Sequence, residues 1–352
     1  MGERVLLKGN IALAEGAIIA GCRYYFGYPI TPQNEVPEYM SQRLPEVGGT
    51  YLQAESEVAA INMVFGASAA GARVMTTTSS PGFSLMQEGI SYLAAAHLPC
   101  VVANIQRGGP GLGNIAPSQA DYFQAVKGGG HGDYHMIVLA PNSPQEMMDL
   151  TILAFDLADL YRTPVMILTD GAIGQMLESV IFPDNYRQKH VSKPWALTGA
   201  KDRNANVIRS LWLDDTGVEE NNKKLQEKYQ QIEQAEVRYE SYMTDNAKII
   251  IIAYGLPARI GYSAVLQARE QGIAAGFFRP ISLYPFPYEP LKKLSENGTE
   301  KYYVVEMSAG QMVEDVKLAV NGKSDVQFYG TLGGRIPEEK HIIDNIMKIM
   351  NN

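Results

Sequence analysis

Residues 51–90 contain strand, helix, strand and helix patterns in succession, and this alternation restricts the fold more than any other stretch. Tyr51 to Ala54 is short and extended, and Ser56 begins a helical pattern that Gly71 ends. Val74 to Thr78 is rich in β-branched residues and is typical of a buried strand, after which Ser79-Ser80-Pro81-Gly82 opens the next helix. The alternation continues from residue 20 to residue 175. It predicts an α/β fold with a parallel sheet covered on both faces.

The apolar pattern then stops and later returns, which suggests three parts. Residues 1–182 form the first α/β domain, and residues 183–246 carry more charge and predict a linker or arm. Within that arm, residues 219–242 have the pattern of a charged helix with little apolar stripe. A second α/β pattern begins with IIIIAYG after Lys248, so residues 247–352 form a smaller C-terminal α/β domain.

Composition excludes several classes of function. The chain of 352 residues has a net charge of −8, which argues against nucleic acid because phosphate binding needs basic patches. Its two cysteines, Cys22 and Cys100, form no CxxC pair, so the chain alone cannot hold a four-thiolate cluster or a structural zinc. We expect no membrane span and no signal peptide, and a cytoplasmic location.

Glu57 is the first candidate catalytic residue, because it is a lone carboxylate at the start of a helix with Ala59, Ala60 and Ile61 behind it. A carboxylate among apolar neighbours loses hydration, which prepares a glutamate to exchange protons at neutral pH. The alternative is that Glu57 only complements the helix dipole. Glu55 is the competing carboxylate, and the pattern predicts that it is less buried.

Thr31 and Arg107 follow predicted strands, where open α/β sheets bind ligands. Pro29 and Pro32 restrict the backbone around Thr31, although a helix cap alone would also explain this threonine. The guanidinium of Arg107 could bind a carboxylate by two parallel hydrogen bonds, with a surface ion pair as the alternative.

The glycines after Arg107 predict a mobile active-site loop. Residues 111–116 also match a relaxed GxGxxA dinucleotide fingerprint, but Pro117 and the lack of a suitable acidic residue weaken that match. His131 and His135 have poor spacing for a metal, so we assign them to a polar loop and expect no metal site.

With these residues collected, the chain resembles the alpha subunits of the thiamine-diphosphate-dependent 2-oxoacid:ferredoxin oxidoreductases over nearly its whole length. The branch for branched-chain 2-oxo acids (3-methyl-2-oxobutanoate, or 2-ketoisovalerate) is the most similar, and the 2-oxoglutarate branch is next. The resemblance rests on five short motifs in the right order: YPITP (28–32), ESEVAA (55–60), TTTSSPGF (76–83), RGGP (107–110), and Arg279-Pro280 with YPFP (284–287).

The resemblance implies a thiamine-pyrimidine-type domain followed by a smaller domain similar to the transketolase C-terminal domain. In that family a glutamate at the Glu57 position hydrogen-bonds N1′ of the aminopyrimidine, which drives the tautomer that removes the C2 proton of thiamine. Thr31 would contact substrate or cofactor, with Tyr28 and Pro29 beside it in the cofactor site. Arg107 would hold the substrate carboxylate.

The resemblance also implies that this chain acts only within a complex. No GDG motif with a following asparagine is present, so Mg²⁺ and the diphosphate would bind to a beta subunit, with thiamine diphosphate shared between the two chains. Iron–sulfur clusters would lie on another subunit. The reaction would convert a 2-oxo acid and CoA to acyl-CoA and CO₂, with electrons passing to ferredoxin.

Two other hypotheses stay open at this point. A dinucleotide-binding protein would use the loop at residues 111–116, and a non-catalytic assembly protein would keep the fold without the chemistry.

Overall fold

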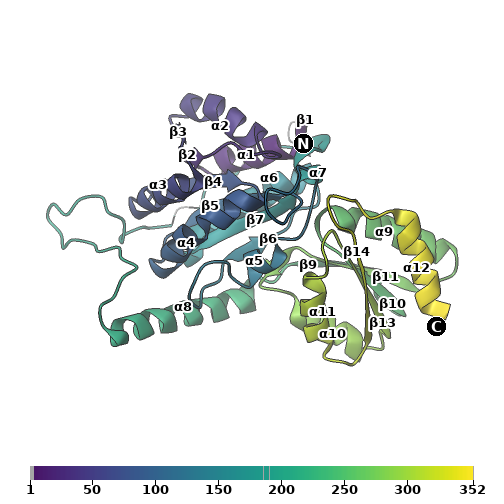
Figure 1. Ribbon diagram of the computed structural model, residues 1–352. Helices are drawn as coiled ribbons and strands as arrows, with labels where there is room; N and C mark the ends of the chain where they lie inside the picture. The colour runs from purple at the N-terminus through teal and green to yellow at the C-terminus, as the bar shows by residue number, and fades with distance from the viewer. Residues whose placement is uncertain (1–3, 185, 190, 352) are drawn as a thin grey trace.

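The computed structural model describes residues 4–184, 186–189 and 191–351, and a seven-stranded sheet organises the first half (Figure 1). The strand order is β12-β6-β7-β5-β4-β2-β3, and every neighbouring pair except β12–β6 is parallel. The predicted parallel sheet is therefore confirmed. Its strands are β2 (Tyr24–Gly27), β3 (Thr50–Gln53), β4 (Val74–Thr78), β5 (Cys100–Gln106), β6 (Ile137–Leu139), β7 (Pro164–Asp170) and β12 (Ser282–Tyr284).

Helices cover both faces of this sheet, as right-handed crossovers between parallel strands require. The helices α3 and α4 pack together on one face, and α1, α2 and α6 pack on the other (Figure 1). The short helices α5 and α7 follow β5 and β7 in the chain. The bounds are α1 (Gly9–Ile19), α2 (Glu35–Glu46), α3 (Glu57–Ala69), α4 (Ser80–Ala95), α5 (Tyr122–Val126), α6 (Pro144–Tyr161) and α7 (Gly171–Gln175).

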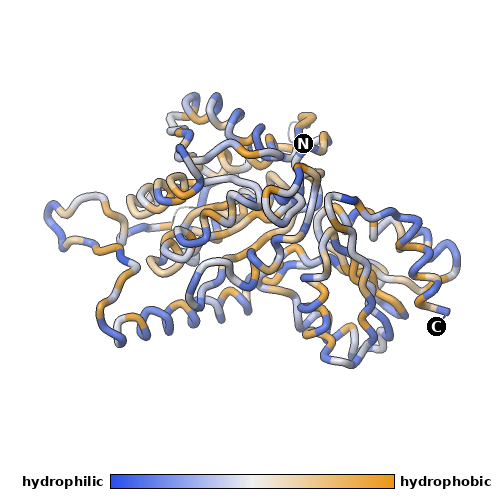
Figure 2. Tube along the Cα trace, in the orientation of Figure 1, coloured by the Kyte–Doolittle hydropathy of each residue, from blue (hydrophilic) through white to orange (hydrophobic). Residues whose placement is uncertain are grey.

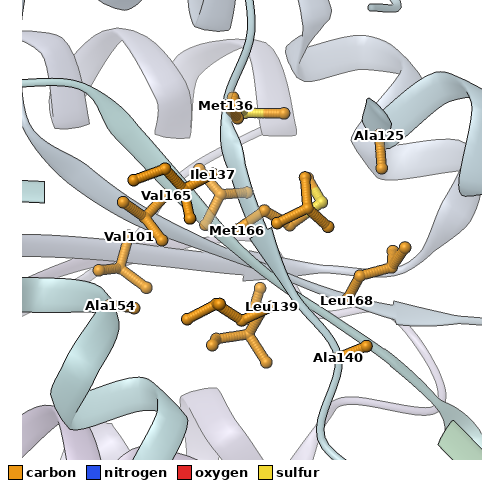
Figure 3. Close-up of a cluster of buried hydrophobic side chains, with 14 of the residues drawn as sticks. Val101, Ala125, Met136, Ile137, Leu139, Ala140, Ala154, Val165, Met166 and Leu168 are labelled. Carbon is orange, nitrogen blue, oxygen red and sulfur yellow. The ribbon is translucent and has the colours of Figure 1, made fainter. Parts of the chain in front are cut away.

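Apolar side chains from the central strands fill the space between these layers. Figure 3 shows Val101 of β5, Ile137 and Leu139 of β6, and Val165 and Met166 of β7 packed in one cluster. All five are fully buried. Burial on both faces explains why these strands are continuous apolar runs in the sequence.

A second sheet of five strands forms the C-terminal half, in the order β14-β13-β10-β11-β9. Its four later strands are parallel, and β9 joins the edge antiparallel to β11. The elements are β9 (Tyr239–Tyr242), β10 (Ile249–Ile252), α9 (Gly255–Glu270), β11 (Ala275–Pro280), α10 (Tyr288–Glu296), β13 (Lys301–Glu306), α11 (Met312–Val320), β14 (Asp325–Gly330) and α12 (Glu339–Asn351).

The two halves are joined by backbone pairing and by buried charge. The strand β12 comes from the C-terminal half of the chain but pairs with β6 at the edge of the first sheet. Arg279 is 1% exposed and donates to both carboxylate oxygens of Glu146 on α6, at 2.7 and 2.6 Å. The Arg279-Pro280 motif thus anchors one half to the other.

A short strand precedes the first helix: β1 (Arg4–Lys8) pairs antiparallel with β8 (Leu177–Ile181). Asn10, in the first turn of α1, donates to Pro32 O at 2.9 Å. The helix of the arm differs from the predicted bounds of residues 219–242. The charged helix of the arm is α8 (Asp215–Ala235), and it ends before β9 because β9 is held by pairing with β11.

The helix α8 carries a narrow apolar stripe, which the sequence pattern underestimated. Leu225, Tyr229 and Ile232 are buried, while most of the helix is hydrophilic (Figure 2). The division at residues 182 and 246 stays a prediction. In the described part of the chain, no helix combines the length and apolar character that a membrane crossing needs.

Replacing Gly16 by alanine should destabilise the fold. A Cβ at Gly16 would lie 2.6 Å from Met148 O, where α1 crosses α6, and overpacking of this kind costs about 1–3 kcal/mol. Gly66→Ala is the matched control on α3, because its Cβ would meet nothing within 4 Å and alanine favours helix by up to about 1 kcal/mol. Urea unfolding of the chain measures both. Equal effects would show that α1 and α6 do not approach this closely.

Candidate functional site

Five neighbouring strands of the first sheet have their carboxyl ends side by side, and the candidate residues lie in the segments that follow these ends. The strands β7, β5, β4, β2 and β3 are parallel, so their carboxyl ends lie side by side. Thr31 follows β2, Glu57 follows β3, and Arg107 follows β5. The first turn of α4 follows β4 between them. The sheet therefore gathers side chains that lie up to 76 positions apart in sequence.

A buried chain of hydrogen bonds holds the 28–32 loop. Tyr25 Oη lies 2.6 Å from Thr77 Oγ1, which in turn lies 2.5 Å from Gln33 Oε1. Gln33 Nε2 donates to Tyr28 O at 3.3 Å. Burial raises the pKa of Tyr25 well above its usual value, so this phenol stays protonated. The loop is thus tied to β4 rather than free in solvent.

Thr31 does not cap a helix, so that alternative is wrong. The helix α2 begins at Glu35, and its N-cap is Asn34, whose side chain donates to Thr31 Oγ1 at 3.2 Å. The Thr31 hydroxyl still has its own proton to donate. Its backbone carbonyl accepts from Arg107 Nη1 at 3.0 Å, which brings two of the predicted site residues together.

The first turn of α4 is held by the buried Ser80 and Asn104 and by the partly buried Asp121. Ser80 Oγ donates to Asp121 Oδ2 at 2.6 Å, and Asn104 Nδ2 donates to the same oxygen at 2.9 Å. The backbone N–H of Arg107 donates to Ser80 Oγ at 3.0 Å. Burial raises the pKa of Asp121, and the two hydrogen bonds oppose that shift. This network sets the position of Arg107 relative to α4.

Glu57 is buried, as the sequence predicts. It is the first residue of α3, its side chain is 6% exposed, and Ser56 supplies the helix cap by accepting from Ala59 N. A Cβ on Gly82 would collide with Glu57 Oε1, so the α4 first turn lies directly against the carboxylate. Within the described residues, no donor reaches the Glu57 carboxylate. Glu55 is exposed, as expected.

Arg107 is a buried cation without a carboxylate partner in the described residues, so the surface ion pair is wrong. Its Nη1 donates to Thr31 O and its Nη2 donates to Leu112 O, each at 3.0 Å. Its Nε is buried and unpaired. A guanidinium held by neutral carbonyls keeps its charge and its remaining N–H groups for an anion.

Further unpaired polar atoms lie at the end of β4. Thr78 Oγ1 and Ser79 Oγ are buried and have no hydrogen-bond partner among the residues that the structure describes, and both lie next to the turn that carries Gly82. Buried polar atoms in native proteins almost always have partners, so these atoms indicate a polar ligand or ordered water. Thr78 Oγ1 and Glu57 Oε1 both lie next to Gly82, where an added Cβ would collide with each of them.

The glycine loop does not form a dinucleotide site. Such a fingerprint needs a helix that opens directly after the glycines, whereas α5 begins at Tyr122 and the loop folds back on itself. Gly108 N donates to Ala116 O and Asn114 N donates to Gly108 O, each at 2.9 Å. The loop contacts the C-terminal half through Asn114 Nδ2, which donates to Gly333 O.

The other candidates lie around this centre. Tyr28 is 37% exposed and Pro29 is exposed, so both lie at the surface of the 28–32 loop. His135 stacks on Tyr284 at 4.3 Å between ring centroids and has a structural role away from the strand ends. The described residues contain no group of three side chains that could hold a metal ion.

Sequence reasoning missed the residues that position the site. Asn104 lies inside the apolar run of β5, and an amide within such a run is a signal that could have identified it. Ser80, Gln33 and Asp121 had no such local signal. Asp170, at the end of β7, caps α7 and also accepts from Leu256 N, and burial raises its pKa to about 6.

Comparison with protein-family models gives two adjoining matches. Residues 15–244 match the pyruvate flavodoxin/ferredoxin oxidoreductase, thiamine diphosphate-binding model. Residues 247–342 match core domain II of pyruvate:ferredoxin oxidoreductase.

Two curated proteins are similar over almost their whole length. The ketoisovalerate oxidoreductase subunit VorB of Methanothermobacter marburgensis is 52% identical, with 98% of this chain and 97% of that protein aligned. The 2-oxoglutarate synthase subunit KorA of Methanocaldococcus jannaschii is 40% identical, with 95% and 97% aligned.

Solved structures share the fold. The 2-oxoglutarate:ferredoxin oxidoreductase of Magnetococcus marinus, solved with 2-oxoglutarate, coenzyme A and succinyl-CoA bound, has a TM-score of 0.85 and 25% identity. The alignment covers 99% of this chain, which spans 65% of that chain. A split-gene transketolase has a TM-score of 0.63 at 13% identity and shows the fold alone.

Tyr25→Phe should destabilise the chain because it removes the first member of the Tyr25–Thr77–Gln33 hydrogen-bond chain. We expect a loss of about 1 kcal/mol in the free energy of unfolding, the usual contribution of a buried hydrogen bond. Tyr51→Phe is the control, since Tyr51 stacks on Tyr25 at 5.6 Å but its hydroxyl has no partner among the described residues. Equal effects of the two substitutions would argue against the chain.

Proposed function

The chain belongs to the pyruvate flavodoxin/ferredoxin oxidoreductase family and is a subunit of a 2-oxoacid:ferredoxin oxidoreductase. From this premise we propose that it supplies the half of a thiamine diphosphate site that exchanges protons with the cofactor. The observation that carries the proposal is the buried Glu57 carboxylate, which accepts no hydrogen bond from any residue in the described part of the chain.

Glu57 is suited to accept a hydrogen bond from the cofactor ring. Its burial removes competing water, and Gly82 leaves the carboxylate face open because a larger residue would cover it. Glu57 would hold the aminopyrimidine ring through a hydrogen bond to N1′ and would exchange a proton with that nitrogen. The cofactor, when bound, would supply the acidic C2 carbon on its separate thiazolium ring.

Arg107 and Thr31 hold and orient the 2-oxo acid. The guanidinium has free N–H groups for the substrate carboxylate, and the Thr31 hydroxyl can donate to an oxygen beside it. Because Arg107 also donates to Thr31 O, one rigid unit presents both donors. Tyr28 and Pro29 lie at the surface of the 28–32 loop and would line the cofactor site.

Partner subunits complete the enzyme in this proposal. The chain lacks a diphosphate motif, so a beta subunit would bind Mg²⁺ and the diphosphate, and another subunit would carry the iron–sulfur clusters. A face of α3 and α4 with small or apolar exposed residues would receive the beta subunit: Val58, Gly66, Ala70 and Leu85. Electrons would then pass to ferredoxin, and the acyl group to CoA.

The substrate proposed is 3-methyl-2-oxobutanoate, with 2-oxoglutarate as the second candidate. The support is the greater identity to a ketoisovalerate oxidoreductase subunit than to a 2-oxoglutarate synthase subunit, 52% against 40%. Assays of CoA-dependent viologen reduction by the assembled complex with both acids would rank them by kcat/KM. A higher kcat/KM for 2-oxoglutarate would reverse the assignment.

Glu57→Gln should leave the complex assembled but slow exchange of the cofactor's C2 proton by at least about 100-fold, the usual size of a lost acid–base contribution. Hydrogen–deuterium exchange by NMR on the assembled complex measures this step separately from turnover. Glu55→Gln is the matched control, because Glu55 is two residues away and exposed. Wild-type exchange in the Glu57 variant would remove this residue from the mechanism.

Arg107→Gln should lower kcat/KM for the 2-oxo acid by about 10- to 150-fold, since a hydrogen bond to a charged group contributes about 1.5–3 kcal/mol. Steady-state kinetics should show the loss mainly in KM, with the C2 exchange rate of the cofactor unchanged. Full activity after substitution of Thr31, Glu57 and Arg107 together by alanine would instead support a non-catalytic assembly role.

A further inference from the structure

A basic pocket lies at the amino-terminal ends of the strands of the first sheet, whereas the candidate site lies at their carboxyl ends. It is a cavity of about 380 Å³ between the arm, α8 and the turns that precede β5 and β7. The helix α4 runs from Ser80 at the candidate site to Ala95 at the pocket, and its 16 residues span about 24 Å. The pocket is therefore separate from the strand ends that carry Glu57 and Arg107. Figure 1 shows α4 running between the strand ends and the arm.

Positive charge gathers at this pocket in a chain whose net charge is −8. Arg162, Arg209 and Lys224 line the cavity together with His97. Lys228 lies beneath them, where its Nζ is 2.7 Å from His97 Nδ1 and donates to Arg162 O at 2.8 Å. None of these five side chains forms an ion pair with a carboxylate within the described residues, although Glu220 also borders the cavity.

Both tryptophans of the chain belong to the same pocket. The guanidinium of Arg162 lies over the Trp195 ring at 4.5 Å, and that of Arg209 lies over the Trp212 ring at 5.4 Å. Such stacking holds each guanidinium in place without neutralising it. The arm is itself fixed here, since Leu197 N donates to Ala69 O and Asn206 Nδ2 donates to Ala196 O.

The backbone at the pocket is strained at two positions. His97 and Arg162 have φ angles of 52° and 49°, in the left-handed region that side chains other than glycine seldom adopt. They precede β5 and β7, which are neighbours, so both strained residues face one cavity. Each residue ends a helix, His97 after α4 and Arg162 after α6, and the next amide donates back to Leu93 O or Ala158 O. These caps hold both side chains at the cavity.

We propose that this pocket binds a phosphate-bearing metabolite. Two or more negative charges would complement the unpaired cations, and a cavity of about 380 Å³ lies within the usual range for small-molecule sites. Guanidinium and ammonium groups are the side chains that bind phosphate best. Two sources share this chemistry, a free nucleotide or pyrophosphate and the nucleotide part of coenzyme A.

Charge on Lys228 makes such binding depend on pH. Burial and the nearby positive charge of Arg162 lower the pKa of Lys228 to about 7. Burial and the positive charges of Lys228, Arg162 and Lys224 lower the pKa of His97 to about 4. A bound anion favours charged Lys228, so binding takes up a proton. Affinity should therefore fall as the pH rises through about 7.

Tryptophan fluorescence of the full chain tests the proposal directly, because both indoles lie at the pocket. Pyrophosphate, ADP and CoA are titrated separately at low salt, with calorimetry as a second measurement. We expect saturable binding with Kd below about 1 mM for at least one probe, weakened by added NaCl. Equal affinity for pyrophosphate and ADP would identify the phosphates as the feature recognised, and tighter binding of CoA would identify coenzyme A as the source.

Two neighbouring lysines of α8 supply a matched pair of variants. Lys224→Gln removes a pocket cation and should weaken binding at least tenfold, whereas Lys223→Gln should leave it unchanged because Lys223 pairs with Glu219 outside the cavity. Lys224 is exposed, so its variant should fold, and thermal unfolding checks this.

Two results would overturn the proposal: the absence of binding by all three probes, or equal affinity of the Lys224 and Lys223 variants for a probe. If wild type binds no probe and the Lys224→Gln variant loses its partner subunits, the pocket instead receives an acidic segment of a partner chain.

Discussion

Parallel strand pairing is the constraint on which the rest of the molecule depends. The strands β7, β5, β4, β2 and β3 all run in one direction, so each crossover helix returns the chain to the amino ends of the strands. The loops that follow these strands therefore gather at the carboxyl ends, and the loops that precede them gather at the amino ends. The candidate catalytic residues lie at the carboxyl ends, and the basic pocket lies at the amino ends.

Buried arginines that pair with carboxylates have a structural role, and they differ in this from the buried arginine of the candidate site. Arg73 is 3% exposed in its side chain and pairs with Asp156 and Asp159 at 3.0 and 2.8 Å. The Arg279 side chain is also buried, at 1% exposed, and it forms an ion pair with Glu146. Arg107 is also buried but has backbone carbonyls as its partners. Burying an ion without its counter-ion is costly, so an unpaired cation in the described chain indicates a ligand that brings the opposite charge.

Rigidity of the joined halves supports this interpretation of the site. Gln119 lies in the loop after β5, and its side chain donates to Tyr254 O and accepts from Met307 N. Tyr122 Oη donates to Asp315 at 2.7 Å across the same junction. These contacts fix the glycine loop and the C-terminal half relative to the strand ends, so the chain can present a preformed half-site to a partner.

Local patterns identified most elements because periodicity and turn residues act over a few neighbours. The strand Val74–Thr78 has the predicted bounds, and the fold class and the burial of Glu57 agree with expectation. The same reasoning failed where a distant partner decides the outcome. Residues 239–242 have a helical pattern in the sequence but form a strand because β11 pairs with them, and residues 4–8 form a strand because β8 pairs with them.

By itself, the amino-acid sequence determined the alternating α/β pattern, the helix that begins at Glu57 and the motifs that carry the family resemblance. Only the tertiary structure decided that Arg107 has no carboxylate partner among the described residues, that Ser80, Asn104 and Asp121 hold it, and that β12 crosses to the first sheet. It also brought four arginine and lysine side chains, His97 and both tryptophans together at the amino-terminal ends of the strands. The physical reason is that these features depend on contacts between residues far apart in the chain, whereas periodicity records only which face of its own element a residue occupies.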